Sequence, residues 1–133
     1  MPQQVWEALR TDARARLVDV RTDMEWRTVG VPELAETGRE PALISWQVFP
    51  SMQVNEGFVD DLRAAGLTPE HKLYFLCRSG VRSLAAGRAA EEAGFAHAFN
   101  IKDGFEGPPD ESGQRGTLAG WQADGLPWTR PPG

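Results

Sequence analysis

The chain has 133 residues, of which 41% are hydrophobic and 25% are charged, and its formal net charge is −5. This length suits one domain with a real core, and the composition is that of a soluble globular protein. The acidic balance argues against nucleic acid or an acidic membrane as the main partner, and no apolar run approaches the roughly 20 residues of a membrane helix. The first residues lack the apolar stretch of a secretory signal, so we expect a cytoplasmic protein.

Hydrophobic periodicity predicts strands that alternate with helices. In the first half it predicts a helix at 5–9, a strand at 16–21, a polar connection at 22–41 with a helical turn near 23–26, a strand at 42–49 and a helix at 56–65. In the second half it predicts a strand at 72–77, a small-residue helix at 81–93, a strand at 97–101, a turn-rich stretch at 103–116, helical turns at 118–123 and a proline-rich tail from about 127. We therefore expect one α/β domain over residues 1–133, with a mainly parallel central sheet flanked by helices on both faces.

Cys77 ends the apolar strand at 72–77, and the polar run 78–83 leads into the next helix. Open α/β sheets bind their ligands at the carboxyl ends of the strands. A loop that begins a helix also points unpaired backbone N–H groups in one direction, which attracts anions. The positive helix end and nearby arginines favour the thiolate form of such a cysteine. The pattern predicts a nucleophilic sulfur in an anion-binding loop.

The single cysteine also excludes some chemistry. It cannot form a disulfide within the chain, and it rules out a dithiol mechanism within the chain. Neither His71 nor His97 has metal-ligand spacing around it, and we interpret both as ordinary surface or strand-flanking residues. We expect no metal and no cofactor.

The loop after the cysteine supplies the candidate binding groups, which are Arg78, Ser79, Gly80, Val81, Arg82 and Ser83. Their backbone N–H groups are expected to converge on negative charge at Cys77, as in an oxyanion hole. The two arginines supply charge for an incoming anion, although Arg82 has the alternative role of holding the loop through an acidic neighbour. Gly80 lets the backbone turn without a Cβ, and Ser83 is expected to cap the helix.

Two further residues end the neighbouring predicted strand. Asp19 and Arg21 are expected to line the same rim or to hold the loop in place. For Asp19, the alternative is a simple hydrogen-bond acceptor at a strand end. We assign both a supporting role.

Two segments, LVDVRTDMEW at 17–26 and LYFLCRSGVRSLAAGRAAEEAGF at 73–95, resemble a rhodanese-like domain of the single-domain sulfurtransferase type. The resemblance extends from about Pro2 to Trp121. Residues 77–83 have the family form CRSGxRS, residues 19–21 match its DVR, and residues 25–26 match its acidic-aromatic pair. One departure is Gly30, at a position where the family often carries a histidine.

The resemblance implies a central parallel sheet and an activity. The activity is transfer of a sulfane sulfur from thiosulfate or a related donor to a thiophilic acceptor, cyanide or a thiol, through a persulfide on Cys77. The expected partners are therefore a small sulfur-containing anion and its acceptor, with a sulfur-relay protein as a further partner that the family allows. No nucleic acid and no membrane is expected.

Two alternatives stay open. A cysteine-dependent phosphatase uses the pattern C-x5-R, whereas only four residues separate Cys77 from Arg82 here, so the spacing disfavours it. A non-catalytic or sulfur-carrier module, which receives persulfide sulfur from a partner protein, would keep the same cysteine and loop. The sequence separates this alternative poorly from an enzyme.

Overall fold

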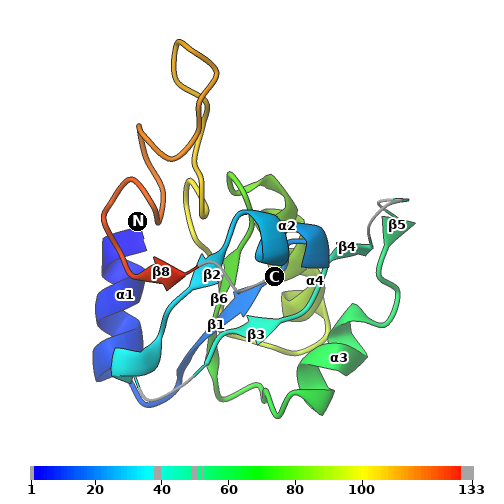
Figure 1. Cartoon of the computed structure of the whole chain (residues 1–133). Helices are drawn as coiled ribbons and strands as arrows, with labels where there is room; N and C mark the ends of the chain where they lie inside the picture. The colour runs from blue at the N-terminus through cyan, green and yellow to red at the C-terminus, as the bar shows by residue number, and fades with distance from the viewer. Residues whose placement is uncertain (1, 38–39, 49–50, 52, 130–133) are drawn as a thin grey trace.

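A central sheet of four parallel strands organises the molecule (Figure 1). The computed structural model describes residues 2–37, 40–48, 51 and 53–129. The strand order is β3 (Ala42–Leu43), β1 (Ala15–Asp19), β6 (Lys72–Leu76) and β7 (Ala98–Asn100). The central pair, β1 and β6, is in register from Ala15 opposite Lys72 to Asp19 opposite Leu76. The predicted parallel α/β architecture is confirmed.

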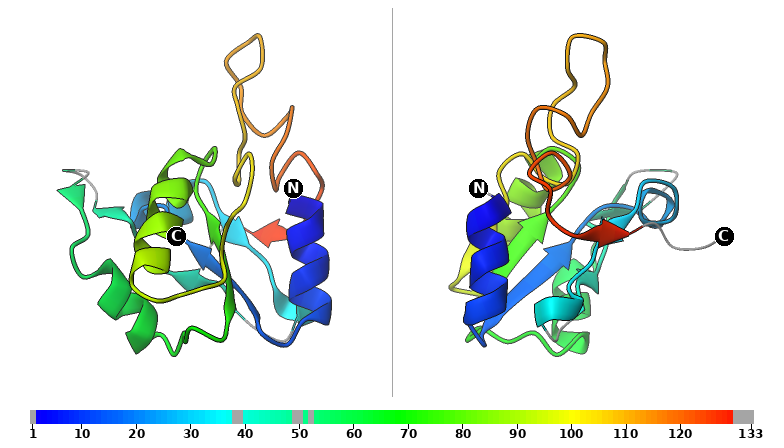
Figure 2. Two further views of the ribbon diagram at one scale, coloured as in Figure 1. Left: turned by 180° about the vertical axis from the view of Figure 1, so that it is seen from behind. Right: turned by 60° about the vertical axis from the view of Figure 1, so that its left-hand side comes forward.

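Helices lie on both faces of this sheet (Figure 2). The helices are α1 (Pro2–Thr11), α2 (Asp23–Thr28), the short 3-10 helix η1 (Ala35–Thr37), α3 (Phe58–Ala64) and α4 (Val81–Glu92). One apolar layer joins α3 and α4 to the sheet through Phe58 and Phe75, and the other joins α1 to it through Leu9 and Leu76. The strand β6 supplies both layers because alternate side chains of a strand point to opposite faces.

The small residues of α4 bring this helix close to the sheet, as the sequence predicts. A Cβ added at Gly87 would lie 3.5 Å from the ring of Phe75, which is ordinary van der Waals contact. The position therefore leaves little room for a larger side chain. This close packing holds the middle of α4 against β6, the strand that ends just before Cys77.

The strand predicted at 42–49 is divided in two. Residues after β3 still follow β1, because the Ile44 N–H donates to the Asp19 carbonyl at 3.0 Å and the Trp46 N–H donates to the Val20 carbonyl at 3.1 Å. The chain then leaves the sheet and forms a small hairpin, in which β4 (Gln47–Val48) pairs with β5 (Gln53–Val54). The predicted end of this strand, 49–50, lies outside the described residues.

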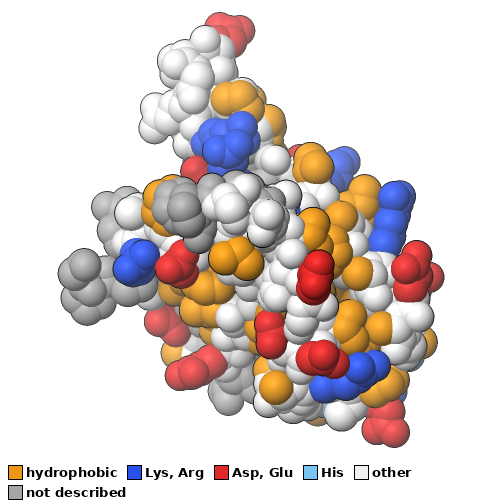
Figure 3. All heavy atoms as spheres, turned by 90° about the vertical axis from the view of Figure 1, so that its right-hand side faces the viewer, with side chains coloured by type: hydrophobic (Ala, Val, Ile, Leu, Met, Phe, Trp, Pro, Cys, Tyr) orange, Lys and Arg blue, Asp and Glu red, His pale blue; other side chains and the backbone are white. Residues whose placement is uncertain are grey.

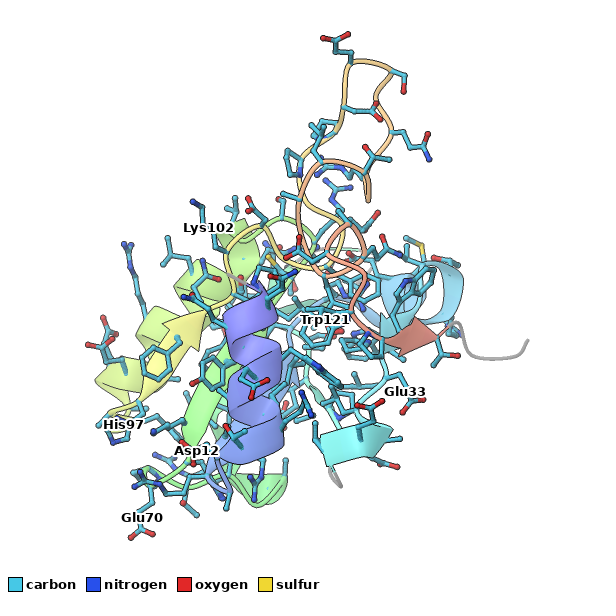
Figure 4. All side chains as sticks on the ribbon, turned by 90° about the vertical axis from the view of Figure 1, so that its left-hand side faces the viewer. Asp12, Glu33, Glu70, His97, Lys102 and Trp121 are labelled. Atoms are coloured by element: carbon cyan, nitrogen blue, oxygen red, sulfur yellow. The ribbon has the colours of Figure 1, made fainter. Side chains whose placement is uncertain are left out.

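The prediction of helical turns at 118–123 is wrong. Backbone bonds that a helix would make locally go instead to distant residues: Trp121 N–H donates to the Gly104 carbonyl at 2.9 Å, and Gln122 N–H to the Phe105 carbonyl at 3.1 Å. The indole of Trp121 is fully buried and lies beside α1, in edge contact with Trp6 (Figure 4). Burial of this side chain, rather than helical periodicity, sets the local path.

The described part of the proline-rich tail contains a strand that the sequence did not indicate. The strand β8 (Trp128–Thr129) pairs antiparallel with β2 (Val31–Pro32).

Between Phe105 and Trp121 the chain projects from the body of the domain (Figures 1 and 2). There the Asp110 carboxylate accepts hydrogen bonds from Ser112, Thr117 and the Gln114 N–H, which lower the pKa of Asp110 to about 2.

On one face of the molecule, the charged side chains do not gather into a single patch (Figure 3). On the face shown in Figure 3, acidic side chains lie among hydrophobic and other ones, with Lys and Arg beside some of them. His97 lies at the edge of the sheet opposite to Lys102 (Figure 4), and the His71 ring accepts a bond from the Thr68 N–H at 3.0 Å. Among the described helices, none is long and apolar enough to cross a membrane.

Candidate active site

Cys77 lies directly between the end of β6 and the start of α4, at the carboxyl edge of the sheet. The helix begins after Gly80, whose φ of +109° lies in the left-handed region that favours glycine. Ser83 is therefore already inside the first turn of α4, and the prediction that it caps the helix is wrong. Its hydroxyl is turned toward the sulfur instead.

The sulfur of Cys77 has two hydrogen-bonding neighbours. The Gly80 N–H donates to Sγ at 3.0 Å, and the Ser83 Oγ lies 3.3 Å from the same atom. Among residues 78–83, all of which the structure describes, Gly80 is the only one whose amide bonds to the sulfur. The prediction that the backbone N–H groups of residues 78–83 converge on Sγ is therefore wrong, because a single amide bonds to the sulfur. The Cys77 side chain is only 1% exposed, so the sulfur lies at the bottom of the loop.

Asn100, at the end of β7, holds this arrangement from the neighbouring strand. Its Oδ1 accepts a hydrogen bond from the Ser83 hydroxyl, and its Nδ2 donates to the Gly80 carbonyl at 3.2 Å. The Ser83 hydroxyl has a single proton. When that proton lies on Asn100, the Cys77 thiol can donate its own proton to Ser83, and when Cys77 is a thiolate the hydroxyl can turn to donate to sulfur.

The second arginine of the loop is already paired. Arg82 forms two hydrogen bonds with Glu25 of α2, Nη1 to Oε1 at 2.7 Å and Nη2 to Oε2 at 3.0 Å. Burial alone would lower the pKa of the Arg82 guanidinium, but the hydrogen bonds and charge of Glu25 raise it above its usual value. Burial likewise opposes ionisation of Glu25, but Arg82 outweighs it and lowers the pKa of that carboxyl. Arg82 therefore joins the loop to α2, which is the alternative role that the sequence left open.

The first arginine of the loop is free. The Arg78 side chain is exposed and forms no ion pair with any described residue. It lines a pocket of about 500 Å³ between α2 and the loop, together with Met24, Glu25, Arg82 and Glu106. Cys77 does not line this pocket, although both arginines of its loop do. Positive charge is thus available next to the buried sulfur.

The segment 104–106 forms backbone hydrogen bonds with the start of the sulfur loop. The N–H of Phe105 donates to the Cys77 carbonyl at 2.8 Å, and the N–H of Glu106 donates to the Arg78 carbonyl at 3.0 Å. At Gly104, where φ is +63°, an added Cβ would collide with the Cys77 carbonyl oxygen. Only glycine lets the two backbones approach this closely, so the segment fixes the Cys77 and Arg78 carbonyls at the start of the loop.

Asp19 and Arg21 do not line the rim, because both side chains are 0% exposed. Arg21 donates to Asp19 through Nη2 at 2.7 Å and through Nε at 2.9 Å, and its Nη2 also donates to the Gly30 carbonyl at 2.6 Å. The guanidinium carbon lies 4.2 Å from the centre of the Phe105 ring. The pair therefore lies inside the domain, where Arg21 contacts Gly30 and Phe105.

The sequence profile described as the STR4 middle domain matches residues 2–133. The chain belongs to this family and is a rhodanese-like domain.

Three relatives place the rhodanese-like domain among known proteins. The crystal structure of Rv0390 from M. tuberculosis is 45% identical, with a TM-score of 0.89, and covers 98% of this chain and 96% of that one. The chloroplastic rhodanese-like domain-containing protein 4 of Arabidopsis thaliana is 28% identical over 97% of this chain and 25% of its own length. The polysulfide-sulfur transferase homodimer of Wolinella succinogenes shares the fold, with 21% identity and a TM-score of 0.61 over 96% of this chain and 74% of that one.

The departure at Gly30 has a structural explanation in this rhodanese-like domain. Gly30 has a φ of +124°, and an added Cβ would lie 2.8 Å from the Trp128 ring and 2.9 Å from the Thr129 carbonyl oxygen. Trp128 in turn packs edge-on against Phe105, with ring centres 5.8 Å apart. The strand β8 therefore occupies the space next to Gly30 that a side chain there would need.

Sequence reasoning missed two polar residues of the site, Asn100 and Glu106. Asn100 ends a strand that was predicted beside the strand of Cys77, and parallel strands share their carboxyl edge, so its position was available as a signal. Glu106 lies in a turn-rich stretch that has no periodic pattern. Nothing in the sequence around it indicates that the chain returns to the loop.

Proposed function

We propose that this rhodanese-like domain is a sulfurtransferase that moves a sulfane sulfur from thiosulfate, or a related donor, to cyanide or a thiol through a persulfide on Cys77. The observation that carries the proposal is the position of the Gly80 N–H and the Ser83 hydroxyl, both beside Sγ. The Gly80 amide is a fixed donor to this sulfur, and the Ser83 hydroxyl can turn to donate to it when the sulfur carries negative charge. The residues in direct support are those of the loop, Arg78, Ser79, Gly80, Val81, Arg82 and Ser83.

In the first half-reaction, the Cys77 thiolate attacks the outer sulfur of the donor. A new S–S bond forms to Cys77 as the donor's own S–S bond breaks, and sulfite leaves with the bonding electron pair. Arg78 is the free guanidinium that can accompany the incoming anion, because Arg82 is held by Glu25. A preorganised donor at such a centre is typically worth ~3 kcal/mol of transition-state stabilisation.

In the second half-reaction, the acceptor attacks the outer sulfur of the persulfide. The S–S bond to Cys77 breaks, the acceptor keeps the sulfane sulfur, and Cys77 returns as a thiolate. The Gly80 N–H can hold negative charge at Sγ both before and after transfer. Covalent catalysis in two halves predicts ping-pong kinetics.

The fold shared with the polysulfide-sulfur transferase supports this class of reaction. A polysulfide chain contains the same kind of S–S bond as thiosulfate, so polysulfide belongs among the donors to be compared. Small sulfur compounds and thiols of this kind are consistent with the cytoplasmic setting that we propose. A sulfur-relay protein belongs to the same proposal as an alternative acceptor.

Mass spectrometry of the chain, intact and after digestion to peptides, tests the proposal once the chain has been incubated with each donor. We expect the mass of one added sulfur atom on the Cys77 peptide, its removal by cyanide, and no addition in the Cys77→Ala variant. Turnover of thiosulfate and cyanide should disappear in the same variant. An unmodified peptide with thiosulfate and polysulfide alike would contradict the enzyme.

A sulfur-carrier role is the second candidate, and the burial of Cys77 favours it. At 1% exposure, the side chain offers little surface to a free donor, whereas a partner protein can open the loop as it binds. A native chain that shows no turnover with small donors, but gains sulfur from a cysteine desulfurase, would support the carrier. Rapid turnover with small donors would show that no partner protein is needed to open the loop.

A further inference from the structure

The pocket beside the sulfur loop contains a charge that a site for inorganic anions does not need. Glu106 lines this pocket with Arg78, and its carboxylate makes no hydrogen bond or ion pair with any described residue. Burial raises the pKa of Glu106, against the opposing effect of Arg78. A half-buried carboxylate without a partner costs free energy, and it repels a dianion such as thiosulfate. Positions at which a charged group is partly buried without a partner are often functional.

Of the charged side chains that line the pocket, one pair is already neutralised. Arg82 and Glu25 neutralise each other through two hydrogen bonds, so they offer no net charge to a ligand. Arg78 and Glu106 are left, one positive and one negative, both without an ionic partner among the described residues. Their backbones are joined by the 3.0 Å bond from the Glu106 N–H to the Arg78 carbonyl, so the two residues lie side by side.

A ligand that satisfies both groups carries a cation and an anion close together. We propose that this pocket binds an α-amino-acid thiol such as cysteine, with its carboxylate on Arg78 and its ammonium group on Glu106. The inference rests on the proposed function, because this thiol is the acceptor of the second half-reaction. Met24 and Val29 provide apolar wall for the single methylene group of the ligand. Arg78 follows Cys77 directly, which places the bound thiol next to the loop that holds the persulfide.

The chemistry of transfer to this acceptor balances without a further reactant. The thiolate of cysteine attacks the outer sulfur of the Cys77 persulfide, one S–S bond forms and one breaks, and cysteine persulfide leaves. The proton of the acceptor thiol ends on the departing persulfide or in water, and Cys77 is left as a thiolate. No net oxidation occurs.

Binding of unreactive thioether probes tests the pocket without any sulfur transfer. The probes are S-methylcysteine, which carries both charges, methylthiopropionate, which lacks the ammonium group, and methylthioethylamine, which lacks the carboxylate. Because a hydrogen bond to a charged group contributes enough for about a tenfold change in affinity, we expect S-methylcysteine to bind about tenfold more tightly than either single-charge probe. Glu106→Gln should remove the advantage over methylthiopropionate.

The matched control is Glu92→Gln, which removes the same charge from α4 about 15 Å along the helix from Arg82. It should leave the ratio of the probe affinities as it is in the native chain. Equal affinity of the three probes, or an unchanged ratio in Glu106→Gln, would overturn the proposal. Isothermal titration calorimetry gives these affinities directly.

Discharge of the loaded persulfide separates this proposal from the proposed function. We expect cysteine to remove the sulfur faster than mercaptopropionate or cysteamine at equal thiolate concentration, and Glu106→Gln to reduce the ratio of cysteine to cyanide rates by about tenfold. Equal discharge by all thiols from a persulfide that does form would overturn the pocket while the sulfurtransferase stands. If no donor loads Cys77, the sulfurtransferase fails, and the binding measurements still decide the pocket.

Discussion

The Ser83 hydroxyl lies 3.3 Å from the sulfur of Cys77, six residues earlier in the chain. Its only proton is shared between two acceptors, because the same oxygen also forms a hydrogen bond with Asn100 Oδ1. The side chain of Ser83 is fully buried, so water does not compete for this proton. The protonation state of the sulfur and the direction of the Ser83 hydroxyl are therefore coupled.

Replacing Ser83 by alanine removes one of the two donors near the sulfur. Because a hydrogen bond to a charged group is worth about 1.5–3 kcal/mol, we expect the Cys77 thiolate of Ser83→Ala to be alkylated about tenfold more slowly at neutral pH. The thiolate absorbance in the ultraviolet should fall in parallel, and it reports on Cys77 alone because the chain has one cysteine.

Asn100 provides the control for this experiment. If it acts through the Ser83 hydroxyl, Asn100→Ala should change the alkylation rate in the native chain but add little in a Ser83→Ala background. Additive effects in the double variant would show that the two residues act separately. An alkylation rate in Ser83→Ala equal to the native rate would remove the hydroxyl from the mechanism.

The sequence identified the part of the site that is continuous in the chain. Cys77 and its loop follow a strand whose apolar character is unmistakable, and a strand followed by a helix fixes where such a loop lies. The contacts that cross the chain were not available in the same way. The sequence offered pairing with an acidic neighbour as one of two roles for Arg82. Which acidic residue that is, Glu25, depends on the packing of α2. The positions of Glu106 and Trp128 depend on a long return of the chain, for which local periodicity carries no information.

The ion pair of Glu25 and Arg82 makes stability depend on pH. The pKa of Glu25 is lowered in the folded chain, so the pair stabilises the fold above the unfolded-state pKa of about 4.3 and loses this contribution as the pH falls through the lower folded value. The native chain should therefore lose stability on acidification below about pH 4, and Glu25→Gln should show a shallower loss over the same range.

Urea unfolding of both chains at neutral and acidic pH measures this difference. At neutral pH we expect Glu25→Gln to be less stable by about 2 kcal/mol, because Arg82 is left half-buried without a charged partner. Taking the difference between the two chains removes the parallel contribution of Asp110, whose pKa is also low. Parallel pH curves for the two chains would contradict the prediction.

Gly30 should tolerate no side chain while Trp128 is in place. Gly30→Ala introduces a methyl group 2.8 Å from the Trp128 ring at a φ of +124°, and we expect a loss of about 3 kcal/mol from strain and overpacking together. Gly94→Ala is the matched control, because Gly94 has a similar φ of +106° but no atom within 4 Å of an added Cβ. It should cost only the backbone strain, about 1–2 kcal/mol.

The role of Trp128 can be separated from that of the backbone. In a Trp128→Ala background, the cost of Gly30→Ala should fall because the clash with the ring is removed. It should stay above the cost of Gly94→Ala, because the Thr129 carbonyl oxygen still lies 2.9 Å from the added Cβ. Chemical denaturation of the native chain, the three single variants and the double variant gives the comparison. Equal costs at positions 30 and 94 would show that β8 does not restrict residue 30.

The buried pair of Asp19 and Arg21 should be intolerant of the loss of one charge. Both side chains are 0% exposed, and Arg21 Nη1 has no hydrogen-bond partner among the described residues. Asp19→Asn leaves the guanidinium without its counter-charge, and we expect a loss of about 3–5 kcal/mol, as is usual when one partner of a buried pair is removed. Replacing both residues, with Asp19→Asn and Arg21→Met, should be less destabilising than Asp19→Asn alone, because no unpaired charge is then buried. A double variant that is less stable than the single one would mean that the Arg21 bond to the Gly30 carbonyl outweighs the cost of the buried charge.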